Sequence, residues 1–217
     1  MEMSVADYAR RRGVSRQRAL AMIRAGQLPA KRVGRAWVID QKEVNLRHSY
    51  GRPLGPRMID ALVGALSGRP LAGLSSEERH FASKYLERLR GADDPARLLH
   101  SWMRSRQRGL VEVAANPADL AEIARDPRLV PSGISDERSR LSAVRELEGY
   151  VASDDLLAVL RDNLLIESDA PNVRLHVVEK LPDRPLPLGL LLADLADWNG
   201  PREDARVIEL LRGIRWP

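Results

Sequence analysis

The chain has 217 residues, enough for two small domains with separate apolar cores. It contains no cysteine, which excludes disulfides and thiolate zinc sites, and its four histidines lack the spacing of metal ligands. No run of about 18 apolar residues and no charged leader with a cleavage-like site is present, so we expect a cytoplasmic protein without a membrane span.

Charge is distributed unevenly along the chain. Residues 1–110 hold 22 Lys or Arg and 10 Asp or Glu, a net charge of +12, whereas residues 111–217 hold 13 and 20, a net charge of −7. A basic front half suits nucleic acid, which would repel the acidic back half. The back half is therefore expected either to contact protein or to carry an ordinary solvated surface.

The first 48 residues predict two helices and a hairpin. Gly13 can take the positive φ that ends a first helix. Ser15 is expected to cap a second helix that ends at Gly26, because apolar side chains recur in it at spacings of three and four. Residues 31–39 then predict a β-hairpin with its tip at Val33-Gly34-Arg35. This order of elements is typical of proteins that read duplex DNA.

The segment resembles the excisionase and MerR-like winged helix-turn-helix family over residues 4–46. The phrases that carry the resemblance are Gly13-Val14-Ser15, Ile23-Arg24-Ala25-Gly26, Leu28-Pro29-Ala30 and Val33-Gly34-Arg35, with Trp37 two residues further on. It implies a recognition helix in the major groove, with phosphate contacts from the end of that helix and from the wing. The implied DNA-binding residues are Ser15, Arg16, Gln17, Arg18, Arg24, Lys31, Arg32 and Arg35. Trp37 is expected in the core of the wing.

Residues 49–108 are interpreted as a helical connector. Turn formers at 49–56 mark the junction, and helices are predicted from Met58 to Leu66, from a capping box at 75–78 to Arg90, and from Asp94-Pro95 onward. The second of these helices is expected to bury Phe81, Tyr85 and Leu89. The basic tail that follows the third helix is expected either to touch a nucleic-acid backbone or to be solvated; it contains Arg104, Arg106 and Arg108.

Residues 109–217 alternate short strands with helices, which predicts a mixed α+β domain. Strands are expected at 110–113, 128–130, 148–151 and 172–178, and helices at 117–124, 156–163, 188–197 and 201–213. The fold class is therefore α+β, with an N-terminal winged helix-turn-helix, a helical connector and a mixed α+β C-terminal domain.

This region resembles antitoxins of the AbiEi type over roughly residues 97–215. The likeness lies in Ala-Asn-Pro-Ala-Asp-Leu at 115–120, Asp-Pro-Arg-Leu-Val at 126–130 before Ser132-Gly133, Glu-Gly-Tyr-Val at 148–151, and Asn172-Val173. Such proteins are encoded beside nucleotidyltransferase-like AbiEii toxins, and their N-terminal winged helix binds the promoter of their own operon. The resemblance implies the same roles here.

No arrangement of residues requires catalysis, so we expect no enzyme, cofactor or metal. Ser132-Gly133 lacks the flanking glycine of a nucleophile elbow, and no phosphate-binding loop or His-x-x-x-His pair is present. Asp194 and Asp197 share a helical face, as do Glu203 and Arg206, and both pairs are interpreted as solvated. A leucine stripe in the same helix as Asp194 is expected to be core, although its off-stripe Leu190 could instead dock a partner.

The leading hypothesis is a DNA-binding antitoxin that represses its own operon and counteracts a nucleotidyltransferase-type toxin. The alternative is a transcriptional regulator or excisionase-like factor with an accessory oligomerisation or effector domain. A nuclease that uses the acidic half is the third, least favoured hypothesis. The expected partners are the double-stranded DNA of its own promoter, the cognate toxin by direct or indirect means, and a second copy on DNA. The protein is then expected to be cytoplasmic and nucleoid-associated.

Overall fold

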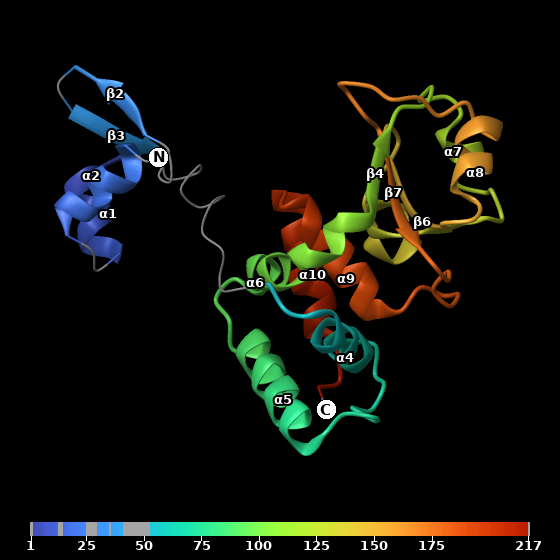
Figure 1. Ribbon diagram of the computed structural model, residues 1–217, viewed down its shortest axis with the longest axis horizontal. Coiled ribbons are helices and arrows are strands. Elements are labelled where there is room, and N and C mark those ends of the chain that lie inside the picture. The colour runs from blue at the N-terminus through green and yellow to red at the C-terminus, as the bar shows by residue number, and fades with distance from the viewer. Residues whose placement is uncertain (1, 13–14, 25–29, 35, 41–52, 217) are drawn as a thin grey trace. The chain divides into compact units, whose positions relative to one another are not determined.

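A computed structural model describes residues 2–12, 15–24, 30–34, 36–40 and 53–216 of the chain. Contacts divide the chain into two compact units, Met1–Ser49 and Tyr50–Pro217 (Figure 1). Within the described ranges, no helix combines the length and the apolar character needed to cross a membrane.

The first unit contains two short helices and a three-stranded antiparallel sheet (Figure 1). Its elements are β1 (Glu2–Ser4), α1 (Val5–Arg12), α2 (Arg16–Arg24), β2 (Lys31–Val33) and β3 (Ala36–Asp40). The strand order is β1-β3-β2, and Val33 of β2 lies opposite Ala36 of β3. Gly34 has a φ of 60°, the left-handed conformation that glycine adopts without strain, at this turn. The hairpin predicted for residues 31–39 is therefore confirmed.

A small apolar core holds the first unit together. Tyr8 of α1, Ala19 of α2 and Ile39 of β3 are almost completely buried. Trp37 is half-buried and packs against this core, as expected for a residue inside the hairpin rather than one that stacks on bases. Because so few side chains form this core, the stability of the unit depends on each of them.

The second unit is a four-stranded mixed sheet with helices on both faces, so the α+β class is confirmed. Its helices are α4 (Pro56–Leu66), α5 (Ser76–Arg90), α6 (Pro95–Met103), α7 (Leu120–Ile123), α8 (Leu156–Asp162), α9 (Leu188–Trp198) and α10 (Pro201–Arg212). Its strands are β4 (Leu110–Val113), β5 (Leu129–Pro131), β6 (Leu147–Ala152) and β7 (Val173–Val178). Their order is β4-β7-β6-β5, with β6 and β7 parallel and the other neighbours antiparallel.

Alternation along the strands sends side chains to two different cores. Val151 and Leu175 pack on one face of the sheet with α7 and α8. Val130 and Tyr150 pack on the other face with α9. Figure 1 shows α9 on the side of the sheet away from α7 and α8. Because successive strand residues point to opposite faces, the polar residues Glu148 and His176 also lie on the α9 side. The sheet thus separates an apolar layer from a layer that contains polar groups.

Helix α9 forms the centre of the larger core. Leu191, Leu192 and Leu195 are completely buried, which confirms the predicted leucine stripe. Gly189 lies against α4 so closely that a Cβ atom there would be 2.2 Å from the carbonyl oxygen of Val63. Helices of the expected connector share this apolar core with α9 and α10, and the division into units accordingly groups residues 50–217 together.

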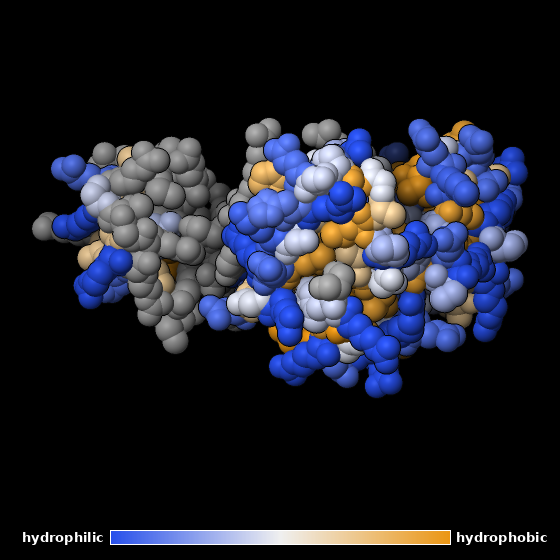
Figure 2. Space-filling model, turned by 90° about the horizontal axis from the view of Figure 1, so that it is seen from below, coloured by the Kyte–Doolittle hydropathy of each residue, from blue (hydrophilic) through white to orange (hydrophobic). Residues whose placement is uncertain are grey.

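Helix α5 begins at the predicted capping box, since Ser75 Oγ accepts from the Glu78 amide and the Glu78 carboxylate accepts from the Ser75 amide. The prediction that Phe81 faces inward is wrong, because its side chain is 45% exposed. The buried stripe consists of Ala82, Leu86 and Leu89, which follow one another at helical spacings of four and three. The face of this unit seen in Figure 2 accordingly carries apolar side chains among charged ones.

Candidate functional site

Eight residues of the first unit were predicted to bind DNA, and every one of them whose side chain the structure describes is exposed. Ser15, Arg16 and Gln17 are exposed where α2 begins, and the amide of Ala19 donates to the Ser15 carbonyl at 3.0 Å in the first turn. Lys31 and Arg32 are exposed on β2, an edge strand of the sheet. Outside the described part lie Arg35 and the side chains of Arg18 and Arg24.

These exposed groups have the chemistry of a DNA-reading surface. A guanidinium matches the paired acceptors of guanine in the major groove, and a side-chain amide matches adenine. Cations on a hairpin can bind phosphate without selecting sequence. In the described part of the unit, Arg16 and Gln17 thus expose a guanidinium and an amide where α2 begins, and Lys31 and Arg32 expose two cations on β2.

A second, buried polar site lies where β6, β7, α9 and the 3₁₀ helix η1 (Arg104–Gly109) meet. Tyr150 and His176 are direct neighbours across the parallel strands, and their rings stack with centroids 4.9 Å apart. Both side chains face α9, which presents Asp194. We call the set around these residues the buried polar cluster; its members are Arg106, Ser132, Glu148, Tyr150, His176, Asp194 and Trp198.

Asp194 is the centre of one half of the cluster. Its carboxylate lies 2.9 Å from Nη2 of Arg106 and accepts a hydrogen bond from the hydroxyl of Tyr150 at 2.8 Å. The hydroxyl of Ser132 also donates to it. The expectation of a solvated Asp194 is wrong: the residue is completely buried, because α9 is surrounded by the sheet and the other helices.

Glu148 is the centre of the other half and is also completely buried. Its carboxylate lies 2.8 Å from Nε2 of His176 and accepts from the indole of Trp198 at 2.5 Å. Gly133, with a φ of 50°, leaves room for this carboxylate, since a Cβ atom there would lie 1.7 Å from Glu148 Oε2. A glycine is therefore required at 133 for both conformation and space.

Burial and charge together determine the protonation of the cluster. Burial alone raises the pKa of Asp194, but the charges of Arg106 and His176 reverse this and lower its pKa below the ordinary value. Burial alone lowers the pKa of His176, yet Asp194 and Glu148 raise it above the ordinary value. Burial raises the pKa of Glu148, and His176 opposes that rise only in part. Asp194 and Arg106 are therefore a charged pair, while the pKa values of Glu148 and His176 are both raised.

The other residues of the two pairs that were expected to be solvated, Asp197, Glu203 and Arg206, also have side chains that are largely buried. The side chain of Asp197 is 1% exposed and lies 3.6 Å from Nδ1 of His100, and Glu203 is paired with Arg202 at 3.1 Å. Arg206 is buried too and donates to the carbonyl of Arg138 at 2.6 Å. The interpretation of these residues as a solvated surface is therefore wrong, because α9 and α10 pack against each other and α6.

In the basic tail after α6, Arg106 neither faces solvent nor is free to touch a nucleic acid, so both predictions are wrong for this residue. Arg106 turns inward to Asp194 and Tyr150, and its side chain is only 15% exposed, whereas Arg104 is exposed. A buried cation needs a buried carboxylate, and α9 supplies it. Sequence reasoning missed this pair, although one signal was present: a carboxylate inside an otherwise apolar helix indicates a buried partner.

The buried cluster joins segments of the second unit that are far apart in the sequence. Ser132 is completely buried, and its hydroxyl donates to Asp194 rather than to His176. Among the described side chains, no three His, Asp or Glu groups are arranged to hold a metal ion. The arrangement instead ties η1, β6, β7 and α9 together.

A pocket of about 500 Å³ opens beside this cluster. Arg106 and Tyr150 line it from the buried side, and Lys180 and Leu190 line it from the segments that precede and form α9. The cluster therefore reaches a cavity through two of its polar side chains.

Comparisons with known proteins find no family model, no curated protein and no solved structure that matches this chain.

Proposed function

We propose that this chain is a sequence-specific DNA-binding antitoxin that represses its own operon. The observation that carries the DNA-binding part is the exposure of Arg16 and Gln17 at the start of α2 together with that of Lys31 and Arg32 on the following hairpin. All four belong to one small unit whose elements follow in the order helix, helix, hairpin.

In the proposed complex, α2 enters the major groove by its first turn. Arg16 contacts guanine and Gln17 contacts adenine, since these side chains match the acceptor and donor patterns of those bases. Lys31 and Arg32 bind phosphates and fix the register of the helix. The resemblance to winged helix-turn-helix proteins supports this assignment and extends it to Arg18, Arg24 and Arg35.

The antitoxin part of the proposal rests on the resemblance of residues 97–215 to AbiEi-type proteins. In this view, the first unit binds the promoter of its own operon, and two copies of the chain occupy repeated half-sites on the DNA. The second unit counteracts a nucleotidyltransferase-type toxin. The net negative charge of residues 111–217 supports a protein partner for that part, because an acidic surface is repelled by phosphate.

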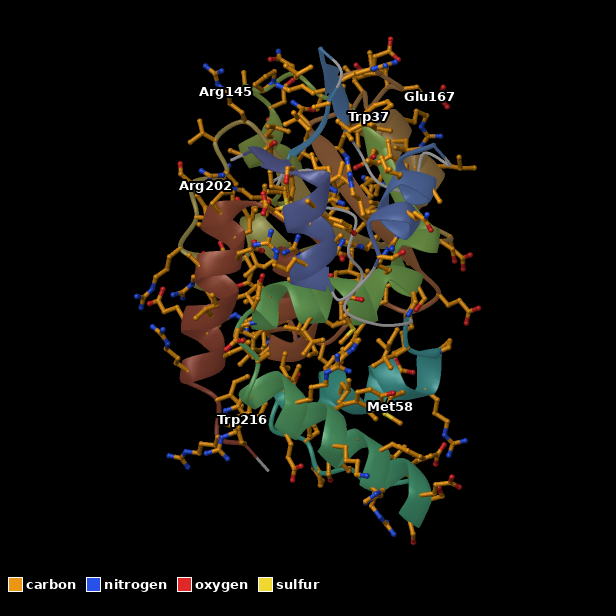
Figure 3. All side chains as sticks on the ribbon, turned by 90° about the vertical axis from the view of Figure 1, so that its left-hand side faces the viewer. Trp37, Met58, Arg145, Glu167, Arg202 and Trp216 are labelled. Atoms are coloured by element: carbon orange, nitrogen blue, oxygen red, sulfur yellow. The ribbon has the colours of Figure 1, made fainter. Side chains whose placement is uncertain are left out.

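The DNA-binding part is tested by fluorescence anisotropy with the full chain and the DNA that precedes its own gene. We expect saturable binding that weakens steeply with salt, and a loss of about tenfold or more in affinity for Arg16→Ala. The control Arg145→Ala removes the same charge from the surface of the second unit, where the side chain points outward (Figure 3), and should bind as the wild type does. Equal binding by the wild type and Arg16→Ala would contradict the proposal.

The antitoxin part is tested by co-expression with the product of the adjacent gene, scored by growth. We expect rescue of growth by the wild-type chain. We expect no rescue by a chain that ends at residue 52 and so lacks the second unit. DNA binding without rescue would instead favour the alternative, a transcriptional regulator or excisionase-like factor. Rescue without a co-purified complex would show that the antitoxin acts indirectly.

A further inference from the structure

We propose that the pocket beside the buried polar cluster binds a small molecule that carries a carboxylate or phosphate group on an apolar body. This inference goes beyond the proposed function and does not depend on it. It rests on the juxtaposition of an apolar cavity with a buried guanidinium and a rim cation that, among the described residues, lack a hydrogen-bond partner for one nitrogen and an ion-pair partner, respectively.

The cavity has the size and lining of a small-molecule site. Its volume of about 500 Å³ falls within the range of about 300–1,000 Å³ that is usual for such pockets. Its walls include the apolar side chains of Val63 from α4, Val178 from β7, and Leu181 and Leu190 around the start of α9. An apolar ligand body would be desolvated against these walls, which favours binding.

The buried side of the cavity contains a donor that lacks an acceptor. Nη2 of Arg106 is used by Asp194 and Tyr150, but Nη1 is buried without a hydrogen-bond partner among the described residues. Leaving a buried charged donor unsatisfied is unfavourable, so such groups normally have a partner. Nη1 itself is covered by protein atoms, so a ligand oxygen in the cavity that Arg106 lines supplies this partner when the guanidinium turns toward the cavity.

The charges at the rim leave one cation for an anionic group. Arg69 and Asp183 neutralise each other at 2.8 Å. Lys180 is exposed and has no ion-pair partner within the described part of the chain. The remaining carboxylate of the lining, Asp60 on α4, is exposed like Lys180, so water screens both charges. Carboxylate and phosphate oxygens both accept hydrogen bonds from a guanidinium and from an ammonium group, so the pocket fits a ligand that carries either anionic group.

The test is a calorimetric titration of the full chain, without DNA, with phenyl phosphate, benzoate and the uncharged match benzyl alcohol. We expect at least one of the two anions to bind at millimolar concentration or below, and about tenfold more tightly than the alcohol, which corresponds to about 1.4 kcal/mol. Binding of phenyl phosphate alone or of benzoate alone identifies the preferred anionic group.

Variants locate the binding. Lys180→Ala should weaken anion binding, and Leu190→Asp should abolish it by placing a like charge on an apolar wall. Lys84→Ala, which removes an exposed cation of α5 that is not part of the lining, and Arg16→Ala, in the first unit, should bind as the wild type does. Circular dichroism confirms that each variant is folded.

Three results would overturn the proposal. They are the absence of binding by both anions, equal binding of the alcohol, and unchanged anion binding in folded Lys180→Ala and Leu190→Asp chains. Because no DNA is present, each result leaves the DNA-binding proposal untouched, and failure of DNA binding leaves this one untouched.

Discussion

Arg106 and Asp194 form an ion pair inside the second unit, with 2.9 Å between Nη2 and Oδ1, although they come from segments far apart in the sequence. Burial alone lowers the pKa of Arg106, but Asp194 raises it above its ordinary value, and Arg106 in turn lowers the pKa of Asp194, so each charge favours the other. The pair joins η1 to α9 and, through Tyr150, to the sheet.

Removal of Arg106 alone should be strongly destabilising. Arg106→Met leaves Asp194 buried without its counter-charge, so we expect a loss of about 3–5 kcal/mol in the free energy of unfolding, measured in urea. The double variant Arg106→Met/Asp194→Asn should be more stable than the single variant, because no charge then remains unpaired. Arg161→Met removes an exposed arginine and should leave stability unchanged. A single variant as stable as Arg161→Met would contradict this account of the pair.

Two glycines should respond oppositely to the same substitution. Gly189→Ala should destabilise the chain by about 1–3 kcal/mol, because its Cβ atom would clash with the backbone of α4, 2.2 Å from Val63 O. Gly64 lies inside α4, where an added Cβ atom would be 3.9 Å from Arg69 Cβ, an ordinary contact, so Gly64→Ala should be neutral or stabilising by up to about 1 kcal/mol. Thermal unfolding of both variants distinguishes these outcomes, and equal effects would show that α4 and α9 do not approach so closely.

Stability should depend on pH through Asp204 near the start of α10. Burial, followed by the charges of Asp94 and Glu203, raises the pKa of Asp204 to about 6, against the partial opposition of His100 and Arg97. A raised carboxyl pKa means that the folded state holds its proton more tightly, so this contribution is present below about pH 4 and is lost as the pH rises through 6.

Asp204→Asn should therefore raise stability at pH 8 by about 1 kcal/mol, a value discounted for the partial exposure of the side chain. At pH 4 the variant and the wild type should be alike. Asp154→Asn, which removes an exposed carboxylate before α8, is the matched control. A variant that is no more stable than the wild type at pH 8 would argue against a raised pKa.

The two parts of the proposed DNA surface should fail in different ways. Gln17→Ala should reduce discrimination between matched and mismatched sites by about 1–3 kcal/mol, because it removes a base contact. Arg32→Ala should weaken binding to all sequences alike and reduce the salt slope by about one, because it removes a phosphate contact. Competition binding at several salt concentrations separates the two effects. A uniform loss for Gln17→Ala would place that side chain on phosphate instead.

Local patterns predicted most elements of the fold correctly. The capping box at Ser75, the turn at Gly34 and the strand predicted at 172–178 each depend on neighbours in the sequence, and each is present in the structure, the strand as β7. Phe81 shows where such reasoning fails, since two overlapping stripes on α5 are both plausible until the neighbouring helices select one.

The two candidate sites also differ in how far local sequence patterns predict them. Exposed cations such as Arg16 and Lys31 were predicted from their own segment, because exposure on a short helix or an edge strand needs no distant partner. The buried polar cluster was not predicted, because a carboxylate such as Asp194 has the same local pattern whether it faces water or a cation from another element.

The sequence by itself determined the order of helices and strands, the mixed α+β class and the position of the basic hairpin, because caps, turns and apolar periods act over a few residues. Only the tertiary structure decided which charged residues are buried, which ones pair, and where a cavity opens beside them. These depend on contacts between η1, the sheet and α9, which burial of apolar surface brings together and which no local pattern encodes.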